Sequence, residues 1–251
     1  MHDKYNRTIL TCFVGSSVQA VVINFAPLLY LTFHNTYNIP LQKITLLVTF
    51  NFLLQLCVDA ASVVFVDRIG YRAGAILAHA FAGLGLVLMA LLPDAMPDPY
   101  VGLFIATIIY SVGSGLLEVL ISPIMEACPT KNKDRAMSLL HSFYCWGHTF
   151  MVLVSTLFFV IFGIENWKIL TLIWAVVPLV NMISFARVPI APLISEGEKG
   201  MSIAELAKSK LFWLMLVAMV CGGASEQSVS QWASALAIMK FSSGIFSLNL
   251  P

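Results

Sequence analysis

Residues 100–126, YVGLFIATIIYSVGSGLLEVLISPIME, form an apolar segment that is long enough to cross a lipid bilayer and that carries a carboxylate near its middle. Glu118 lies ten residues before Cys128, where a polar loop begins. This separation corresponds to roughly 15 Å of helix, half the thickness of a hydrocarbon core. A carboxylate at that depth costs about 2.5–3.5 kcal/mol to insert, so we expect Glu118 to face protein or a water-filled cavity.

The polar residues of this segment recur at helical spacing. They follow one another at intervals of three or four residues and therefore share one face of a helix: Thr107, Ser111, Ser114, Glu118 and Ser122. The other faces are mostly aliphatic. The sequence thus predicts a membrane-spanning helix whose polar face is directed into the protein.

The composition of the chain indicates an integral membrane protein. Of the 251 residues, 59% are hydrophobic and only 11% are charged, whereas soluble domains contain roughly 25% charged residues. The net charge of +1 argues against nucleic acid as a partner. The five cysteines show no C-x-x-C or Cys/His ligand spacing, so we expect unpaired thiols, no metal and no cofactor.

Seven apolar segments have the length of a spanning helix. They cover residues 8–33, 44–66, 73–92, 100–126, 136–163, 167–186 and 211–239. The first segment is too long for the hydrophobic part of a signal peptide and lacks a small-residue cleavage pattern, so we interpret it as a retained span.

These segments predict an all-α membrane protein with a six-helix bundle over residues 1–187. A polar linker over 188–210 follows, in which Ser202 and Glu205 are spaced as the capping box of a short amphipathic helix. A seventh spanning helix is expected over 211–239, and residues 240–251 form a tail.

Lysine and arginine are distributed unevenly between alternate loops. Eleven are expected on one side of the membrane: Lys4, Arg7, Arg68, Arg72, Lys131, Lys133, Arg135, Arg187, Lys199, Lys208 and Lys210. Three are expected on the other: Lys43, Lys168 and Lys240. By the positive-inside rule, the N-terminus and the linker are cytoplasmic and the protein is a multi-pass protein of the cell membrane.

The fifth segment places further polar groups on one helical face. His141, Tyr144, Cys145 and His148 are spaced as neighbours on a helix, and Tyr144 lies at about the same depth as Glu118 on the preceding antiparallel segment. Two interpretations remain open. The residues form either a hydrogen-bonded network that holds helices together or the wall of a solute cavity.

Other polar residues inside the spans are individually weaker candidates, because such groups commonly bridge neighbouring helices. They are Gln19, Asn24, Asn51, Gln55 and His79. Asp59 is ionisable but lies nearer the cytoplasmic end, so packing and function are both open for it. The seventh segment carries a second deep carboxylate, Glu226, beside Gln231, and the pair Gly222–Gly223 is expected to loosen its helix.

The loop after the second segment reads D-R-x-G-x-R, with Asp67, Arg68, Gly70 and Arg72 at the defined positions. This pattern resembles the signature of the major facilitator superfamily. The resemblance implies a bundle of two three-helix inverted repeats (3+3), with the signature at the cytoplasmic hinge between the two halves of a transporter.

Three further motifs resemble the fucose-permease group of sugar:proton symporters. They are G-x-G-L-L-E-x-x-x-x-P, L-L-H-x-F and G-A-x-E followed by Trp, which contain Gly113, Gly115, Glu118, Pro123, His141, Gly223, Glu226 and Trp232. The resemblance implies that Glu118 handles substrate and protons. The first-span acid of that group has no counterpart here; the nearest polar residues, Gln19 and Asn24, do not titrate.

Transporters of this superfamily contain two six-helix halves with the site between them. This chain resembles one half and one further helix, so we expect a truncated product that does not transport alone. The expected partners are a small polar solute, protons, the lipid bilayer and a missing C-terminal half.

The sequence therefore predicts a secondary transporter, or the N-terminal portion of one, for a small polar solute such as a sugar. A drug antiporter is the rival within the superfamily, but its fifth span would be rich in glycine, whereas this one has only Gly147 and Gly163. An enzyme with H-E-x-x-H and a nucleotide-driven pump with G-x-x-x-x-G-K-[ST] are disfavoured because both motifs are missing. A non-transporting remnant or a solute sensor stays open.

Overall fold

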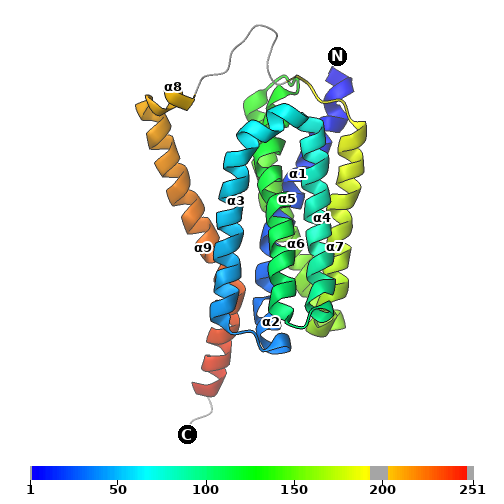
Figure 1. Ribbon diagram of the computed structural model, residues 1–251, viewed down its shortest axis with the longest axis vertical. Helices are drawn as coiled ribbons and strands as arrows, with labels where there is room; N and C mark the ends of the chain where they lie inside the picture. Colours follow the sequence, from blue (N-terminus) through cyan, green and yellow to red (C-terminus); the bar gives the residue numbers. More distant parts are fainter. Residues whose placement is uncertain (1, 193–202, 248–251) are drawn as a thin grey trace. The chain divides into compact units, whose positions relative to one another are not determined.

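The computed structural model describes residues 2–192 and 203–247, which fold almost entirely into helices (Figure 1). The elements are α1 (His2–Leu28), α2 (Tyr30–Tyr37), α3 (Leu41–Ile69), α4 (Tyr71–Ala95), α5 (Pro99–Ala127), α6 (Lys133–Phe162), a 3₁₀ turn (Ile164–Asn166), α7 (Trp167–Arg187), α8 (Ile203–Ala207) and α9 (Lys210–Ser247). The chain divides into unit 1, Met1–Leu193, and unit 2, Ile194–Pro251.

Seven of the described helices are long and apolar enough to cross a membrane, namely all except α2 and α8. They correspond one to one with the seven predicted segments. The predicted all-α, multi-pass membrane fold is thereby confirmed, with six spans in unit 1 and one in unit 2 among the residues described.

The first predicted segment is wrong in one respect, because it is divided between two helices. α1 ends at Leu28 and α2 begins at Tyr30. Pro27 has no backbone N–H and its ring crowds the preceding turn, which favours a break. The N–H of Leu29 bonds to the carbonyl of Ala26 at 2.9 Å, a tighter spacing than that of an α-helix.

Two helix starts are defined by side-chain caps in the predicted loops. Asp98 accepts a hydrogen bond from the N–H of Tyr100 at 2.9 Å, and Pro99 occupies the first turn of α5. Asn132 accepts from the N–H of Arg135 at 2.9 Å at the start of α6. Both caps satisfy N–H groups that have no partner within the helix.

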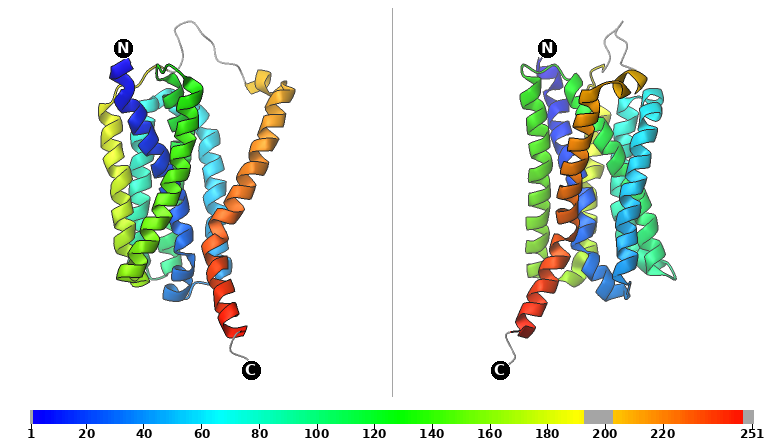
Figure 2. Two further views of the ribbon diagram at one scale, coloured as in Figure 1. Left: turned by 180° about the vertical axis from the view of Figure 1, so that it is seen from behind. Right: turned by 90° about the vertical axis from the view of Figure 1, so that its left-hand side faces the viewer.

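The six spans of unit 1 divide in sequence order into two triplets, α1–α3–α4 and α5–α6–α7, and the helices pack mainly against members of the other triplet (Figures 1 and 2). In two inverted repeats, α1 corresponds to α5, α3 to α6 and α4 to α7. The contact between α1 and α6 then corresponds to that between α5 and α3, and the contact between α4 and α5 corresponds to that between α7 and α1. The pairs α1–α5 and α4–α7 join equivalent helices. This pairing is what two inverted three-helix repeats predict.

Two glycines at equivalent places in the repeats share one backbone conformation. Gly70, after α3, has φ 84° and ψ 150°, and Gly163, after α6, has φ 84° and ψ 153°. Each N–H bonds to a carbonyl of the preceding turn, that of Val66 at 2.8 Å and that of Phe159 at 2.9 Å. This region of φ and ψ is essentially restricted to glycine.

The equivalent helices α4 and α7 are also linked at both ends by a basic side chain. Arg72, in the first turn of α4, donates to the carbonyls of Phe185 and Ala186 at 3.1 and 2.9 Å, near the end of α7. Lys168, in the first turn of α7, pairs with Asp94 near the end of α4. A cation at a helix C-terminus interacts favourably with the helix dipole.

Unit 2 contains α8, α9 and the chain between them. α8 lies where a short amphipathic helix was predicted, although Ser202 of the capping box is outside the described residues. α9 begins at the predicted place and continues beyond residue 239 to Ser247, so the predicted boundary between seventh helix and tail does not coincide with a helix end. The helix runs through Gly222–Gly223 without interruption, and the expected loosening there stays a prediction.

Candidate functional site

Polar side chains of α3 and α5 meet inside unit 1. Ser111 donates to Oδ1 of Asn51 at 2.6 Å, and Nε2 of Gln55 donates to Oε2 of Glu118 at 3.3 Å. Asp59 lies one helical turn beyond Gln55, close enough for its carboxylate to interact electrostatically with Glu118. We call these five residues the polar ladder. Its α3 members recur every four residues and so lie on one face.

A glycine allows the two helices of the polar ladder to approach closely. A Cβ on Gly115 of α5 would lie 3.1 Å from Cγ1 of Val58 and 3.3 Å from Cγ of Gln55. Both distances are tighter than ordinary van der Waals contact. The missing side chain therefore lets Gln55 reach across to Glu118.

Two acceptor atoms of the polar ladder are buried without a hydrogen-bond donor among the residues described. They are Oε1 of Gln55, a residue that is only 5% exposed, and Oδ1 of Asp59. Leaving such an acceptor unsatisfied costs about 1–3 kcal/mol. The Gln55 acceptor belongs to the amide group that donates to Glu118, so an acceptor without a donor lies near that carboxylate.

Glu118 itself is exposed, whereas the polar residues earlier on α5 are buried. Thr107, Ser111 and Ser114 are each at most 3% exposed, and their hydroxyl groups donate to backbone carbonyls of α5 or to Asn51. The prediction that the polar face is directed into the protein is confirmed for these three residues. The carboxylate stands where that buried stripe reaches an accessible face.

A second polar pair joins α1 and α6. Nδ2 of Asn24 donates to the hydroxyl of Tyr144 at 3.3 Å and to the carbonyl of Ala20 at 2.9 Å. Asn24 is buried and Tyr144 is half-buried. Gly147 allows the helices to approach closely here. A Cβ at this position would lie only 2.7 Å from Cβ of Ser17.

The structure thus pairs Glu118 with α3 and Tyr144 with α1. α6 packs mainly along α1 and makes only minor contact with α5, although the two are consecutive. Glu118 and Tyr144, which were predicted to lie at similar depth, thus belong to two different hydrogen-bonded pairs, and their contribution to one cavity wall stays a prediction. His141 is exposed on α6 and Gln19 is partly buried on α1.

His79 of α4 has a structural role. Nδ1 lies 2.7 Å from the carbonyl of Ala75, and Nε2 lies 2.8 Å from Nδ2 of Asn181 on α7. Because a carbonyl only accepts, Nδ1 must carry the proton and Nε2 accepts from the amide. The helix-bridging interpretation of His79 is confirmed.

The remaining predicted residues lie on α9 of unit 2 and in the hinge signature at the junction of α3 and α4. Glu226, Gln231 and Trp232 lie on α9 of unit 2, where Nε2 of Gln231 donates to Oε1 of Gln227 at 3.3 Å. Their participation in a site with Glu118 stays a prediction. Of the hinge signature, Gly70 forms the turn and Arg72 contacts α7, Arg68 is exposed, and the side chain of Asp67 is outside the described part. The hinge role also stays a prediction.

The described residues contain no group of three or more His, Cys, Asp and Glu side chains that could hold a metal ion. All five cysteines are free.

Comparisons with known proteins identify a family. The family model described as Major Facilitator Superfamily matches residues 9–250. No curated protein sequence matches the chain.

Several solved structures of transporters have a similar fold. One is a POT family transporter in complex with a thioalcohol-conjugated peptide, with 18% identity, TM-score 0.60 and coverage of 90% of this chain and 48% of that one. A D-xylose–proton symporter has 17% identity and TM-score 0.60, with 92% of this chain and 54% of that one covered. A POT family transporter in complex with 5-aminolevulinic acid has 17% identity and TM-score 0.60, with 89% of this chain and 47% of that one covered. The chain therefore spans about half the length of these structures.

Proposed function

Because the chain belongs to the Major Facilitator Superfamily, we propose that it forms the N-terminal portion of a proton-coupled secondary transporter for a small polar solute. The observation that carries this proposal is the polar ladder. An exposed carboxylate, Glu118, is hydrogen bonded to Gln55, whose Oε1 is a buried acceptor without a donor among the described residues, and it interacts electrostatically with Asp59. If these residues served only to pack helices together, their buried oxygen atoms would be expected to accept hydrogen bonds.

In the proposed mechanism, Glu118 takes up a proton when the site opens to one side of the membrane. Two carboxylates at close range repel each other, so a proton on either Glu118 or Asp59 relieves the repulsion. Solute then binds to the protonated site, and the two halves rock around it to open on the other side. Release of the proton resets the carrier.

The solute site is proposed to lie on the accessible face of unit 1. Glu118, His141, Tyr144, Asn24 and Gln19 would contribute from the first half. Glu226, Gln231 and Trp232 of α9 would contribute from the second half, together with helices of a C-terminal portion that this chain does not supply. The coverage of about half of the similar transporters supports the need for such a portion.

A sugar is the proposed solute class. Sugar hydroxyl groups both donate and accept hydrogen bonds, so they suit the exposed Glu118 carboxylate and the half-buried Tyr144 hydroxyl. A peptide-like solute is the second candidate, because its ammonium group would pair with Glu118 and two similar structures are of POT family transporters. Drug efflux has no comparable support, since a drug antiporter would have a glycine-rich fifth span and this one has only Gly147 and Gly163.

The proposal is tested by uptake into proteoliposomes that contain a full-length version of the transporter. We expect labelled monosaccharides to accumulate when the outside is more acidic, and to stop accumulating when a protonophore collapses the gradient. Unlabelled dipeptides serve as competitors for the second candidate. The proposed function would be refuted if the proton gradient did not change the accumulation of monosaccharides and dipeptides did not compete with them.

The orientation is also proposed: the N-terminus faces the cytoplasm. Eight of the ten lysines and arginines of unit 1 lie at the end of the bundle that carries the N-terminus, and only Lys43 and Lys168 lie at the other end. Ala95→Cys and Lys131→Cys place a thiol at exposed positions at opposite ends of the bundle. These variants would be made in a background without the exposed Cys57, Cys145 and Cys221.

An impermeant maleimide applied to intact cells should label the Ala95→Cys variant and leave the Lys131→Cys variant unlabelled until the membrane is permeabilised. Labelling of Lys131→Cys alone in intact cells would reverse the orientation.

A further inference from the structure

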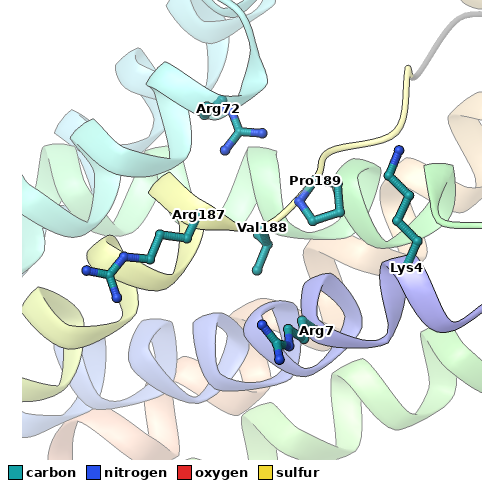
Figure 3. Close-up of a pocket in the computed structure, with 6 residues that line it drawn as sticks. All are labelled: Lys4, Arg7, Arg72, Arg187, Val188 and Pro189. Atoms are coloured by element: carbon teal, nitrogen blue, oxygen red, sulfur yellow. The ribbon is translucent and has the colours of Figure 1, made fainter.

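A basic pocket is located at the end of unit 1 that carries the N-terminus (Figure 3). It has a volume of about 590 Å³ and is lined by Lys4, Arg7, Arg72, Arg187, Val188 and Pro189. Four of these six residues are cations and none is an acid. The polar ladder and the Asn24–Tyr144 pair do not contribute to it, so the pocket is separate from the proposed solute site.

Three helices that are distant in sequence supply the pocket, and hydrogen bonds fix their ends together. The hydroxyl of Thr8 on α1 donates to the carbonyl of Pro189 at 2.6 Å, which attaches the chain after α7 to α1. Arg72 of α4 donates to carbonyls of Phe185 and Ala186 on α7. The backbone around the pocket is thus held by contacts that do not depend on a ligand.

The positive charge of the pocket is not neutralised by ion pairs among the described residues. The ion pairs among the described residues join Lys133 to Glu126 and Lys168 to Asp94, and none of these four residues lines the pocket. Arg72 bonds to neutral carbonyls, which leave its full charge in place. The first turns of α1 and α4 bring the positive ends of two helix dipoles to the pocket, and α7 brings one negative end, which Arg72 caps.

The side chains surround a small apolar patch. Figure 3 shows Val188 and Pro189 between Arg72, which comes from α4, and Arg7 and Lys4, which come from α1. The four cationic side chains are exposed. The pocket therefore combines four exposed cations with two apolar residues at the end of a membrane-spanning bundle.

We propose that this pocket binds a phosphate group that belongs to the headgroup of an anionic lipid. A guanidinium fork matches the oxygens of a phosphate, and lysine adds a point charge. Basic pockets between membrane helices on the cytoplasmic side bind such headgroups, and that leaflet is rich in anionic lipid. Val188 and Pro189 suit the apolar part of the lipid next to its phosphate. A bound lipid would add to the hydrogen bonds that already join the ends of α1, α4 and α7.

The test uses the purified 251-residue chain in detergent and measures thermal unfolding and lipid retention by native mass spectrometry. The probes are short-chain phosphatidylglycerol, the zwitterionic phosphatidylcholine with the same acyl chains, and inorganic phosphate. We expect phosphatidylglycerol to raise the unfolding temperature and to be retained, and phosphatidylcholine to do neither. The double variant Arg7→Gln/Arg187→Gln should bind phosphatidylglycerol about 30-fold more weakly, since each cation near an anionic surface contributes about a factor of five.

A matched control removes two charges from the same end of the bundle but outside the pocket. Lys131→Gln/Arg135→Gln should keep wild-type affinity within about twofold, because these exposed residues do not line the pocket. Arg7→Lys/Arg187→Lys keeps both charges and should retain most of the affinity, which guards against a loss caused by misfolding. Arg72 is left unchanged because it also caps α7.

The outcomes are distinct. Pocket-dependent binding of phosphatidylglycerol supports the lipid source, and pocket-dependent binding of inorganic phosphate alone supports the phosphate site with a soluble ligand. The proposal is overturned if neither probe binds, or if the control variant loses as much affinity as the pocket variant.

Discussion

Glu118→Gln is expected to abolish proton-coupled solute uptake while the protein still folds and inserts. The amide has nearly the shape of the carboxyl group and can still accept the hydrogen bond from Gln55, which spans 3.3 Å in the wild type. It cannot take up and release a proton. Because Glu118 is exposed on the bundle, its replacement leaves no buried charge without a partner. The loss should therefore affect coupling much more than stability.

The measurement compares concentrative uptake in proteoliposomes for wild type and variant in a full-length version of the transporter. We expect uptake against a gradient to fall by at least about 100-fold, as is usual when the group that transfers a proton is removed. Glu126→Gln is the matched control: Glu126 lies on the same helix, at its end, and pairs with Lys133 on the surface. Normal concentrative uptake by Glu118→Gln would make Glu118 a packing residue.

Gly113→Ala is expected to have the largest effect on folding. A Cβ at Gly113 would lie 2.4 Å from the backbone nitrogen of Ala82 and 2.9 Å from the carbonyl oxygen of Ala78. These are backbone atoms of α4, so no side-chain rotation can relieve the contact. Overpacking of this kind costs about 1–3 kcal/mol or more. It would act on the interface between α4 and α5, the most extensive helix contact in unit 1.

Thermal unfolding in detergent measures this effect, and Gly222→Ala is the control. A Cβ at Gly222 meets no atom within 4 Å, and alanine is a better helix former than glycine by about 1 kcal/mol. We therefore expect a lowered unfolding temperature for Gly113→Ala and an unchanged or raised one for Gly222→Ala. Equal stability of the two variants would show that α4 and α5 are not in such close contact.

Local patterns predicted the membrane helices and the polar face of α5 well. The intervals of three and four residues between Thr107 and Glu118 require only that the segment be helical, and hydrophobic length identifies the spans. The division of the first span at Leu29 was missed, although Pro27 was the signal for it. A proline near the end of a span is compatible with a kink as well as with a break.

Partner choice between helices was not predictable from the same patterns. Counting residues along consecutive antiparallel spans placed Tyr144 at the depth of Glu118 but did not identify the helix that each residue contacts. The structure brings Gln55 to Glu118 and Asn24 to Tyr144, since glycines 115 and 147 allow α3 and α1 to approach. The four-residue spacing of Asn51, Gln55 and Asp59 was a usable signal for the polar ladder. Taken one at a time, these residues looked like ordinary helix bridges.

The most direct test of the central claim is the pH change that solute produces outside proteoliposomes without an imposed proton gradient. If Glu118 is the site through which protons accompany solute, adding solute to wild-type vesicles should make the medium more alkaline as protons enter. The same addition to Glu118→Gln vesicles, with equal protein inserted, should give no change. An equal alkalinisation in both would contradict the account, because protons would then cross without this carboxylate.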